Sequence, residues 1–263
     1  KMSEDIKYLQ QYASMGYDLV IGVGFLMQDS IKKVAAKYPD VKFAIIDSYV
    51  DRPNVKSILF KEEEGSFLVG ALAAMKSKTG KVGFIGGMKV PLIKKFEVGY
   101  VQGATYIDPN IEVKILYAGS GQQAFHDPVK GKELADTLYS SGVDVIYHAA
   151  GSTGNGVINS ARENKKFVIG VDSNQNYMAP GFVLTSMVKK VDNGVYKTIK
   201  EVLENSFQSG REELGLKEGG LDYAYDEHNK EVLTQEMKDR VEEIKKNIIE
   251  GEIKIDRSEI TEN

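Results

Sequence analysis

The chain has 263 residues, 42% of them hydrophobic, which is enough for one large domain or two lobes of ordinary size. Its net charge of −4 at pH 7 and its lack of long basic runs argue against a nucleic-acid partner, because phosphate binding needs clustered lysine and arginine. It has no cysteine, which excludes disulfides, thiolate metal sites and a cysteine nucleophile, and no apolar run of the roughly 18 residues that cross a bilayer.

Short, β-branched strand candidates alternate with helix patterns along most of the chain. Most strand candidates are near-continuous apolar runs, which is typical of strands covered on both faces. The strands are predicted at residues 18–23, 42–46, 55–60, 81–85, 112–117, 143–149, 166–171 and 181–186, and the helices at residues 29–38, 62–76, 96–107, 127–142, 154–163 and 191–206. This alternation predicts an α/β fold with parallel sheets and right-handed crossovers.

Two breaks in the alternation favour two lobes over a single sheet or barrel. The polar residues 77–80 precede a fresh strand–helix alternation, and the polar segment 174–181 contains Pro180, as a connecting crossover would. Residues 214–225 are glycine-rich and extended. The predicted parts are a first lobe of residues 1–78 and about 181–232, a second lobe of residues 79–180, and a charged amphipathic helix with a tail at residues 233–263.

Polar or glycine-rich residues follow several strands at their carboxyl ends, where open parallel sheets bind ligands. Asp47 ends the strand at residues 42–46, and Asp172 ends the strand at residues 166–171. A carboxylate there can accept hydrogen bonds from the vicinal hydroxyls of a sugar, or it can cap the next helix. The glycine-rich loop 151–156 allows backbone to approach a ligand closely, but it lacks the ending of a triphosphate-binding loop. These residues favour a small-molecule site.

Three aromatic residues and one lysine are further candidates for ligand contacts. Phe125 lies in a polar loop just before a helix cap, where it could stack on a planar ring or staple the following helix. Phe25 and Phe96 are similar candidates, with core packing as the alternative role. Lys189 could reach a ligand acceptor or an acid partner, although most lysines are solvated.

No sequence pattern indicates catalysis, a metal site or a cofactor. The three histidines are scattered, without metal-ligand spacing and outside any nucleophile motif. His148 falls in an apolar strand, where we expect a core histidine with satisfied hydrogen bonds. We therefore predict no catalytic residue, no metal, no cofactor and no enzyme activity.

An ordered series of motifs resembles the basic membrane protein family, also called the purine nucleoside receptor A family. The resemblance runs from about residue 6 to at least residue 207. The matching stretches are residues 16–25 (GYDLVIGVGF), 38–47 (YPDVKFAIID), 64–70 (EGSFLVG), 82–88 (VGFIGGM), 131–135 (GKELA), 149–156 (AAGSTGNG), 169–172 (IGVD) and 185–189 (TSMVK).

The resemblance implies the substrate-binding component of an ABC importer with a type I periplasmic-binding-protein-like fold. Two α/β lobes would close on a nucleoside of the purine class, with aromatic rings against the base and aspartates on the ribose hydroxyls in the interlobe cleft. The residues at matching positions are Asp47, Phe125, Gly151, Gly154, Asp172 and Lys189, with Phe25 and Phe96 also on family aromatics. A transporter permease would be the partner, and the protein would be extracytoplasmic and lipid-anchored, although this sequence shows no lipid-attachment cysteine.

One part of the family pattern has no match here. The family begins with a strand that ends in an Asp/Ser-Phe-Asn loop, followed by a helix. We therefore expect an N-terminally incomplete first lobe, with an exposed sheet edge and exposed apolar surface. Two other functions stay open: a ligand-sensing regulatory domain on the same fold, and a nucleoside-processing enzyme, which would need a catalytic base or metal cluster.

Overall fold

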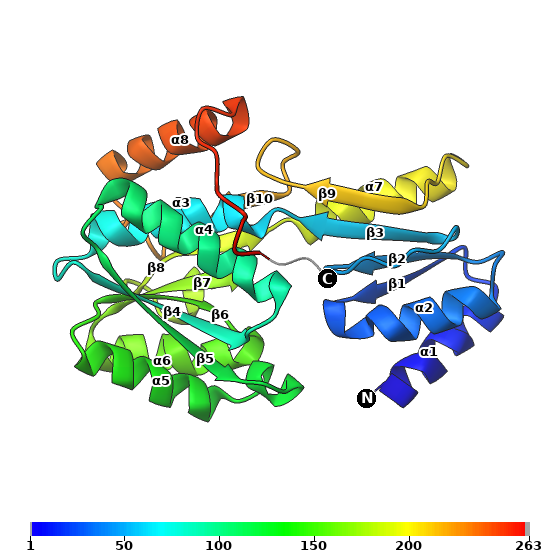
Figure 1. Cartoon of the computed structure of the whole chain (residues 1–263), viewed down its shortest axis with the longest axis horizontal. Coiled ribbons are helices and arrows are strands. Elements are labelled where there is room, and N and C mark those ends of the chain that lie inside the picture. The colour runs from blue at the N-terminus through cyan, green and yellow to red at the C-terminus, as the bar shows by residue number, and fades with distance from the viewer. Residues whose placement is uncertain (1, 261–263) are drawn as a thin grey trace. The chain divides into compact units, whose positions relative to one another are not determined.

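The computed structural model describes residues 2–260, which fall into two units (Figure 1). Unit 1 contains residues 2–60 and Lys190–Gly220. Unit 2 contains Lys61–Lys189 and the described residues from Leu221 onward. Both units are parallel sheets covered by helices, which confirms the predicted α/β class.

Unit 1 is built on a parallel sheet with strand order β1-β2-β3-β9. Its strands are β1 (Leu19–Val23), β2 (Lys42–Ile46), β3 (Val55–Phe60) and β9 (Gly210–Leu214). Helices α1 (Met2–Ser14) and α2 (Gln28–Lys37) cover one face and α7 (Val191–Leu203) covers the other, while a short 3-10 turn, η1 (Phe25–Met27), follows β1 (Figure 1). Leu9, Ile31 and Phe43 bring α1, α2 and β2 into one buried cluster.

Strand β1 forms one edge of the unit 1 sheet. Val23, at the end of this strand, is 65% exposed, and Tyr8, Tyr12 and Tyr17 nearby in the chain are also exposed. The exposed sheet edge and the exposed apolar surface that the sequence predicted are therefore both present in this unit.

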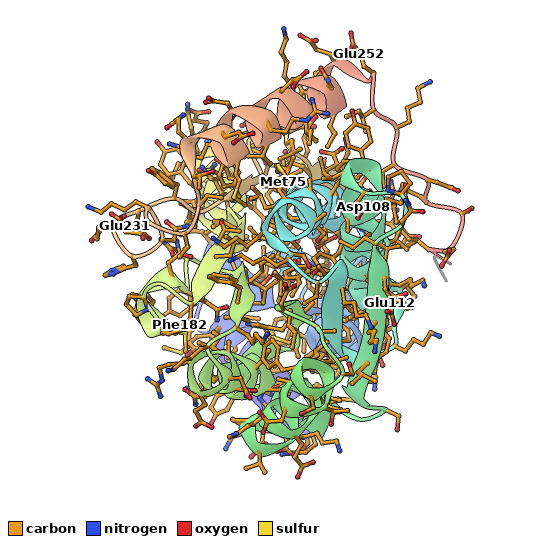
Figure 2. All side chains as sticks on the ribbon, turned by 90° about the vertical axis from the view of Figure 1, so that its left-hand side faces the viewer. Met75, Asp108, Glu112, Phe182, Glu231 and Glu252 are labelled. Carbon is orange, nitrogen blue, oxygen red and sulfur yellow. The ribbon has the colours of Figure 1, made fainter. Side chains whose placement is uncertain are left out.

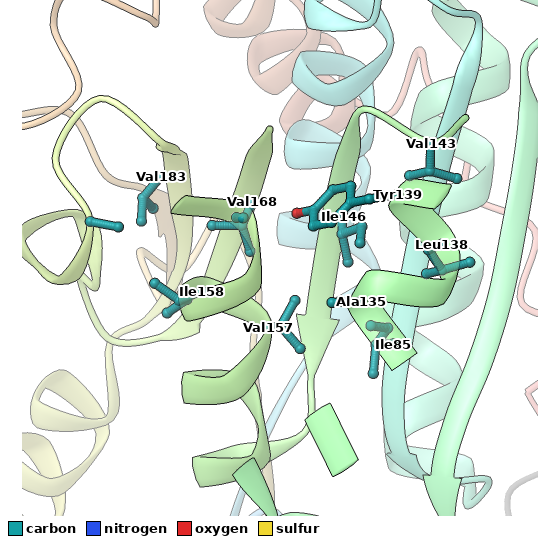
Figure 3. Packing of buried hydrophobic residues seen from close by; sticks show 12 residues of the cluster. Ile85, Ala135, Leu138, Tyr139, Val143, Ile146, Val157, Ile158, Val168 and Val183 are labelled. Atoms are coloured by element: carbon teal, nitrogen blue, oxygen red, sulfur yellow. The ribbon is translucent and has the colours of Figure 1, made fainter. Parts of the chain in front are cut away.

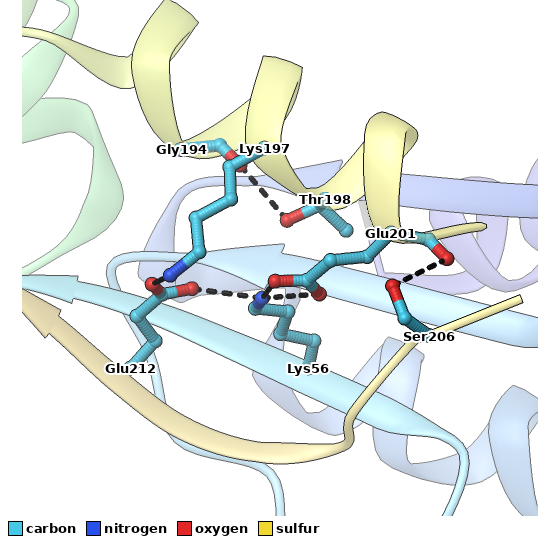
Figure 4. Close-up of polar contacts among 7 residues, drawn as sticks. All are labelled: Lys56, Gly194, Lys197, Thr198, Glu201, Ser206 and Glu212. Atoms are coloured by element: carbon cyan, nitrogen blue, oxygen red, sulfur yellow. Dashed lines mark hydrogen bonds and ion pairs between the residues drawn. The ribbon is translucent and has the colours of Figure 1, made fainter. Parts of the chain in front are cut away.

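The buried Lys56 of β3 forms ion pairs with acidic residues of α7 and β9 in unit 1 (Figure 4). The ammonium of Lys56 lies 2.6 Å from a carboxylate oxygen of Glu201 and 2.8 Å from one of Glu212. Glu212 also pairs with Lys197. Burial alone would raise the pKa of Glu212, but the hydrogen bonds from Lys197 and Lys56 lower it. Paired in this way, the charges are accommodated beside a buried strand.

Unit 2 is built on a sheet with strand order β10-β8-β7-β6-β4-β5, in which only β10 runs antiparallel to its neighbour. Its strands are β4 (Lys81–Met88), β5 (Glu112–Gly119), β6 (Val145–Ala149), β7 (Phe167–Asp172), β8 (Val183–Lys189) and β10 (Leu221–Tyr223). The helices are α3 (Glu62–Lys76), α4 (Pro91–Ile107) and α8 (Gln235–Glu250) on one side, and α5 (Pro128–Ser140) and α6 (Gly154–Asn164) on the other (Figure 1). Short 3-10 turns are η2 (Gln122–Phe125), η3 (Gly151–Thr153) and η4 (Asn176–Met178).

The core between the unit 2 sheet and helices α5 and α6 is fully apolar at its centre (Figure 3). Ile146 of β6 and Val168 of β7 meet Leu138 of α5 and Val157 of α6, and all four side chains are at most 2% exposed. These β-branched strand residues and the helix stripe facing them are what the sequence periodicity predicted. This packing fixes the strands whose ends carry the candidate site.

Helices α3 and α4 approach each other closely because glycines line their contact. A Cβ added at Gly103 of α4 would lie 2.0 Å from the carbonyl oxygen of Phe67 of α3, and one at Gly99 would lie 2.2 Å from that of Glu63. Only glycine allows this backbone contact.

The division into units differs from the boundaries that the sequence suggested. The break at residues 77–80 ends α3 but not the unit, because α3 packs along α4 and so belongs with unit 2. Strand β8, its partner β10 and helix α8 also lie in unit 2, although the sequence assigned them to the first lobe and to a separate C-terminal part. Strands β9 and β10 were not predicted, since both are short and polar and flank a glycine-rich turn.

Candidate functional site

Five residues proposed from the sequence follow consecutive strands at one edge of the unit 2 sheet. Phe125 follows β5, Gly151 and Gly154 follow β6, Asp172 ends β7, and Lys189 ends β8. Because β5, β4, β6, β7 and β8 are parallel, their carboxyl ends lie along the same edge of the sheet. This carboxyl edge, as distinct from an edge strand, is where open α/β sheets bind ligands.

Asp172 has an uncommon backbone conformation at the tip of β7. Its φ is 64°, in the left-handed region, and its side chain is 55% exposed. Asp47 takes the same conformation, with φ 67°, directly after β2 of unit 1. Lys165 and Asn205 also have positive φ, but they lie at helix ends, where this conformation is a usual cap. Two strand-tip aspartates held in a costly conformation favour a functional role for both.

The buried ammonium of Lys189 connects the site to the core of unit 2. It lies 3.7 Å from a carboxylate oxygen of Asp172 and 3.4 Å from one of Glu62, the first residue of α3. The other carboxylate oxygen of Glu62 lies 3.3 Å from the ammonium of Lys95. Glu62 is fully buried, and the two lysines are each 7% exposed. Neither Glu62 nor Lys95 was singled out from the sequence, where both belong to charged stretches typical of a solvated helix start.

Phe96 lies beneath this group of charges. It belongs to α4, is 3% exposed, and its ring centre is 5.6 Å from the Lys189 ammonium, a cation–π distance. The structure therefore places Phe96 in the core, where it packs under a lysine of the site. Phe25 is partly buried in η1, at the carboxyl end of β1 in unit 1.

The loop that carries Phe125 is held by the loop after β6. Ser152 donates a hydrogen bond from its hydroxyl to the Phe125 carbonyl at 3.0 Å, and Thr153 donates to the carbonyl of Ala124 at 2.9 Å. The phenyl ring lies against Gly87, where a Cβ would come within 2.3 Å of a ring carbon. Phe125 is therefore fixed from two sides while remaining partly exposed.

The alternative role of Phe125 as a hydrophobic staple does not fit the helix start. Asp127 is the N-cap of α5 and accepts a hydrogen bond from the Lys130 amide at 2.9 Å. A staple joins the residue before the cap to the fourth helical residue, which are His126 and Gly131 here. Phe125 stands one position too early, and Gly131 has no side chain to meet it.

The glycines after β6 are required by their surroundings. Gly151 has φ 55°, and a Cβ at Gly154 would lie 2.2 Å from the ring of His148. His148 is fully buried, as predicted. The Gln175 side chain lies near its ring, but neither ring nitrogen meets a described residue in hydrogen-bond geometry, so the predicted satisfied hydrogen bonds are not formed. Burial lowers the pKa of His148 to about 4, although the Gln175 side chain opposes the shift.

A groove lies at the opposite edge of the unit 2 sheet and involves none of these residues. It has a volume of about 890 Å³ and is lined by the last turns of α3 and α4 and the first turns of α8, including Met75, Tyr106 and Arg240. Figure 2 views this end of the unit, with Met75 labelled on α3 and Asp108 labelled just after α4.

Two further features bear on the kind of protein this is. Within residues 2–260, no helix is both long and apolar enough to cross a membrane. Over the same range, no three histidine or carboxylate residues are grouped as a metal site would need.

Comparison with known proteins gives a consistent result over nearly the whole chain. The model of the Bmp family, described as "ABC transporter substrate-binding protein PnrA-like", matches residues 1–259. A CD4+ T-cell-stimulating antigen of Listeria monocytogenes is 39% identical, over 91% of this chain and 70% of the relative. The nucleoside-binding protein BmpA of an ABC transporter in Lactococcus lactis is 38% identical, over 91% of this chain and 71% of the relative.

A solved structure confirms the fold. The solute-binding protein of an ABC transporter system from Aeropyrum pernix K1 superposes with a TM-score of 0.83 at 33% identity, covering 97% of this chain and 81% of that protein. The type I periplasmic-binding-protein-like fold and the family resemblance predicted from the sequence are thus both confirmed.

Because His148 is buried with a lowered pKa, we expect its contribution to the free energy of unfolding to be lost in acid. The folded protein holds the pKa near 4, below the ordinary 6.5, so this contribution is complete above pH 6.5 and is lost as the pH falls toward 4. We expect the free energy of unfolding to fall by about 3 kcal/mol more in the wild type than in His148→Leu between pH 7 and pH 4. Urea unfolding of both proteins across this range measures the difference, and parallel pH profiles would contradict the assignment.

Proposed function

The chain belongs to the Bmp family of PnrA-like ABC transporter substrate-binding proteins, and from this premise we propose that it binds a nucleoside of the purine class. The proposed site is the carboxyl edge of the unit 2 sheet. One observation supports the proposal. A partly exposed aromatic ring (Phe125), a glycine-containing loop (Gly151 and Gly154) and a carboxylate–ammonium pair (Asp172 and Lys189) all follow strands at this edge. The nucleoside-binding name of the Lactococcus lactis relative supports the same ligand class.

Each group at this edge has chemistry that suits one part of a nucleoside. The Phe125 ring offers a flat apolar face on which a base can stack. The Asp172 carboxylate can accept hydrogen bonds from two neighbouring ribose hydroxyls, and charge-assisted bonds of this kind are the strong ones. The Lys189 ammonium supplies donors to a ligand oxygen. Gly151 and Gly154 leave room for the backbone to approach the ligand.

The charges at this edge favour an uncharged ligand. Glu62 and Asp172 carry two negative charges, and Lys95 and Lys189 carry two positive charges, within one chain of ion pairs. These four charges sum to zero, so the ion pairs themselves offer no excess positive charge to a phosphate. A phosphate bound near the exposed Asp172 would also be repelled by its carboxylate. We infer that a nucleoside binds in preference to its 5′-phosphate.

Unit 1 offers two groups of the same kind, which we propose as further ligand contacts. Asp47 follows β2 and Phe25 follows β1, both at the carboxyl edge of the unit 1 sheet. Asp47 has the same left-handed backbone conformation as Asp172 of unit 2. Phe25 is partly buried, as Phe125 of unit 2 is. The nucleoside cleft between lobes stays a prediction from the sequence.

Binding without chemical turnover is the activity proposed here. The bound nucleoside would be handed to the permease of an ABC importer on the outer side of the membrane, and a lipid anchor on the full-length protein is part of the same proposal. No metal, cofactor or catalytic group is required for this activity. Affinity alone is sufficient, because the transporter supplies the energy for transport.

Asp172→Asn tests the carboxylate directly. Asparagine tolerates the left-handed backbone at this position but accepts hydrogen bonds more weakly, so we expect inosine to bind about 10–100-fold more weakly. Isothermal calorimetry measures the affinity, and circular dichroism should be unchanged. Asp108→Asn, at the opposite edge of the same sheet, is the matched control and should bind as the wild type does. Equal affinities for both variants would remove Asp172 from the site.

Phe125→Leu tests stacking separately from apolar contact. Leucine keeps an apolar side chain but loses the ring face, and stacking on an aromatic ring contributes about 1–3 kcal/mol per base. The wild type should therefore prefer inosine to free ribose more strongly than Phe125→Leu does, by about 5–100-fold. Competition titrations with both ligands give this ratio. An unchanged preference would show that the base does not stack on Phe125.

A further inference from the structure

We propose that Glu62 is a positioning residue for ligand binding, which acts by holding the Lys189 ammonium at the tip of β8. The inference rests on the proposed function, in which Lys189 and Asp172 contact the ligand. Glu62 itself is fully buried and cannot touch a ligand that binds at the exposed edge of the sheet. Its effect must therefore pass through the side chains that it holds.

The carboxylate of Glu62 divides its two oxygens between two lysines. One oxygen lies 3.4 Å from the Lys189 ammonium, and the other lies 3.3 Å from the Lys95 ammonium. Glu62 is also the first residue of α3, where the partial positive charge of the helix end favours a carboxylate. The acid is thus fixed by the helix end and by Lys95, independently of any ligand.

The backbone of Lys189 is also fixed, so its ammonium is the part that needs a partner. Lys189 is the last residue of β8 and lies opposite Leu221 of β10 in antiparallel register. Lysine carries its charge on a flexible four-carbon stem, which can adopt many positions from one backbone position. Glu62 at 3.4 Å and the Phe96 ring at 5.6 Å restrict the stem from below, and Asp172 lies 3.7 Å away at the surface.

Because the Lys189 ammonium contacts both Glu62 and Asp172, Glu62 influences how many acceptor positions of Asp172 the lysine occupies. Because Glu62 already neutralises buried positive charge, Asp172 does not have to balance Lys189 alone. A carboxylate has about four acceptor positions, and each one that Lys189 occupies is lost to ligand hydroxyls. Without Glu62, the Lys95 and Lys189 ammonium groups would both lose the acid that they share. Lys189 would then move toward Asp172 and occupy that capacity.

A purely structural ion pair would not require this arrangement. Glu62 and Lys95 form an ion pair at 3.3 Å within the core, and this pair does not involve the end of β8. The second lysine, Lys189, is the last residue of β8 and of this part of unit 2, and it adds a charge at the edge that carries the other candidate ligand groups. Its presence there is explained if the acid serves the ligand-binding lysine as well.

A double-mutant cycle tests whether Glu62 acts through Lys189. Inosine affinity is measured by calorimetry for the wild type, Glu62→Gln, Lys189→Met and the double variant, all as the full chain. We expect Glu62→Gln alone to weaken binding about tenfold, and to have no further effect once Lys189 is methionine. An equal loss in both backgrounds would overturn the proposal.

A compensated variant separates positioning from stability. Glu62→Gln combined with Lys95→Met removes one buried charge of each sign, so thermal stability should recover relative to Glu62→Gln. Positioning predicts that inosine binding stays about tenfold weak in this variant, because Lys189 still lacks the Glu62 carboxylate. Recovery of affinity together with stability would show a structural role only. This variant also provides the test if Glu62→Gln fails to fold.

The outcomes for the two proposals are distinguishable. A wild-type protein that binds inosine while Glu62→Gln binds it equally well overturns the positioning role and leaves the proposed function intact. A wild-type protein that binds no purine nucleoside overturns the proposed function, and the positioning role with it.

Discussion

The ion pairs of Glu62 with Lys189 and Lys95 are the interaction on which the arrangement of unit 2 depends most. They join the first turn of α3, helix α4 and the end of β8. Glu62 and Lys189 are 127 residues apart in the sequence. Buried charges are tolerated only when paired, so each of the three elements has to be in place for the others to be stable. One of the three side chains, Lys189, also ends a parallel strand at the candidate site. Fold and candidate site are therefore stabilised by one set of contacts.

The candidate site depends on these ion pairs and on hydrogen bonds between the loops after β5 and β6. The loop after β6 donates hydrogen bonds from Ser152 and Thr153 to the loop after β5, which carries Phe125. The aromatic ring and the ion pairs are thus fixed before any ligand is bound. Binding then costs little ordering of side chains, which is how a rigid site gains affinity for a small neutral molecule.

Much of this fold could be predicted because its signals are local. Buried parallel strands read as apolar runs, so β2 and β3 begin and end at the predicted residues. Asp47 and Asp172 could be placed at the carboxyl ends of their strands, because a single acid directly after such a run has to lie there. The cap at Asp127 was equally visible, since aspartate before proline is a strong helix start.

The remainder could not be predicted because it depends on residues far apart in the chain. Glu62 stands in a run of three glutamates that reads as a solvated helix start, and only packing against α4 and β8 buries it. The unit boundary was misplaced for the same reason, because the close contact of α3 with α4 depends on Gly99 and Gly103 of the later helix. His148 was predicted to be buried, but its lack of hydrogen-bond partners is a property of the packed structure.

The central claim is that a neutral nucleoside binds to the chain through its base and its ribose together. Isothermal calorimetry of the wild-type protein with inosine, ribose and inosine 5′-monophosphate tests it most directly. We expect saturable binding of inosine, with ribose and the monophosphate each bound at least about tenfold more weakly, which corresponds to about 1.4 kcal/mol. Equal or tighter binding of the monophosphate, or no binding of inosine, would contradict it.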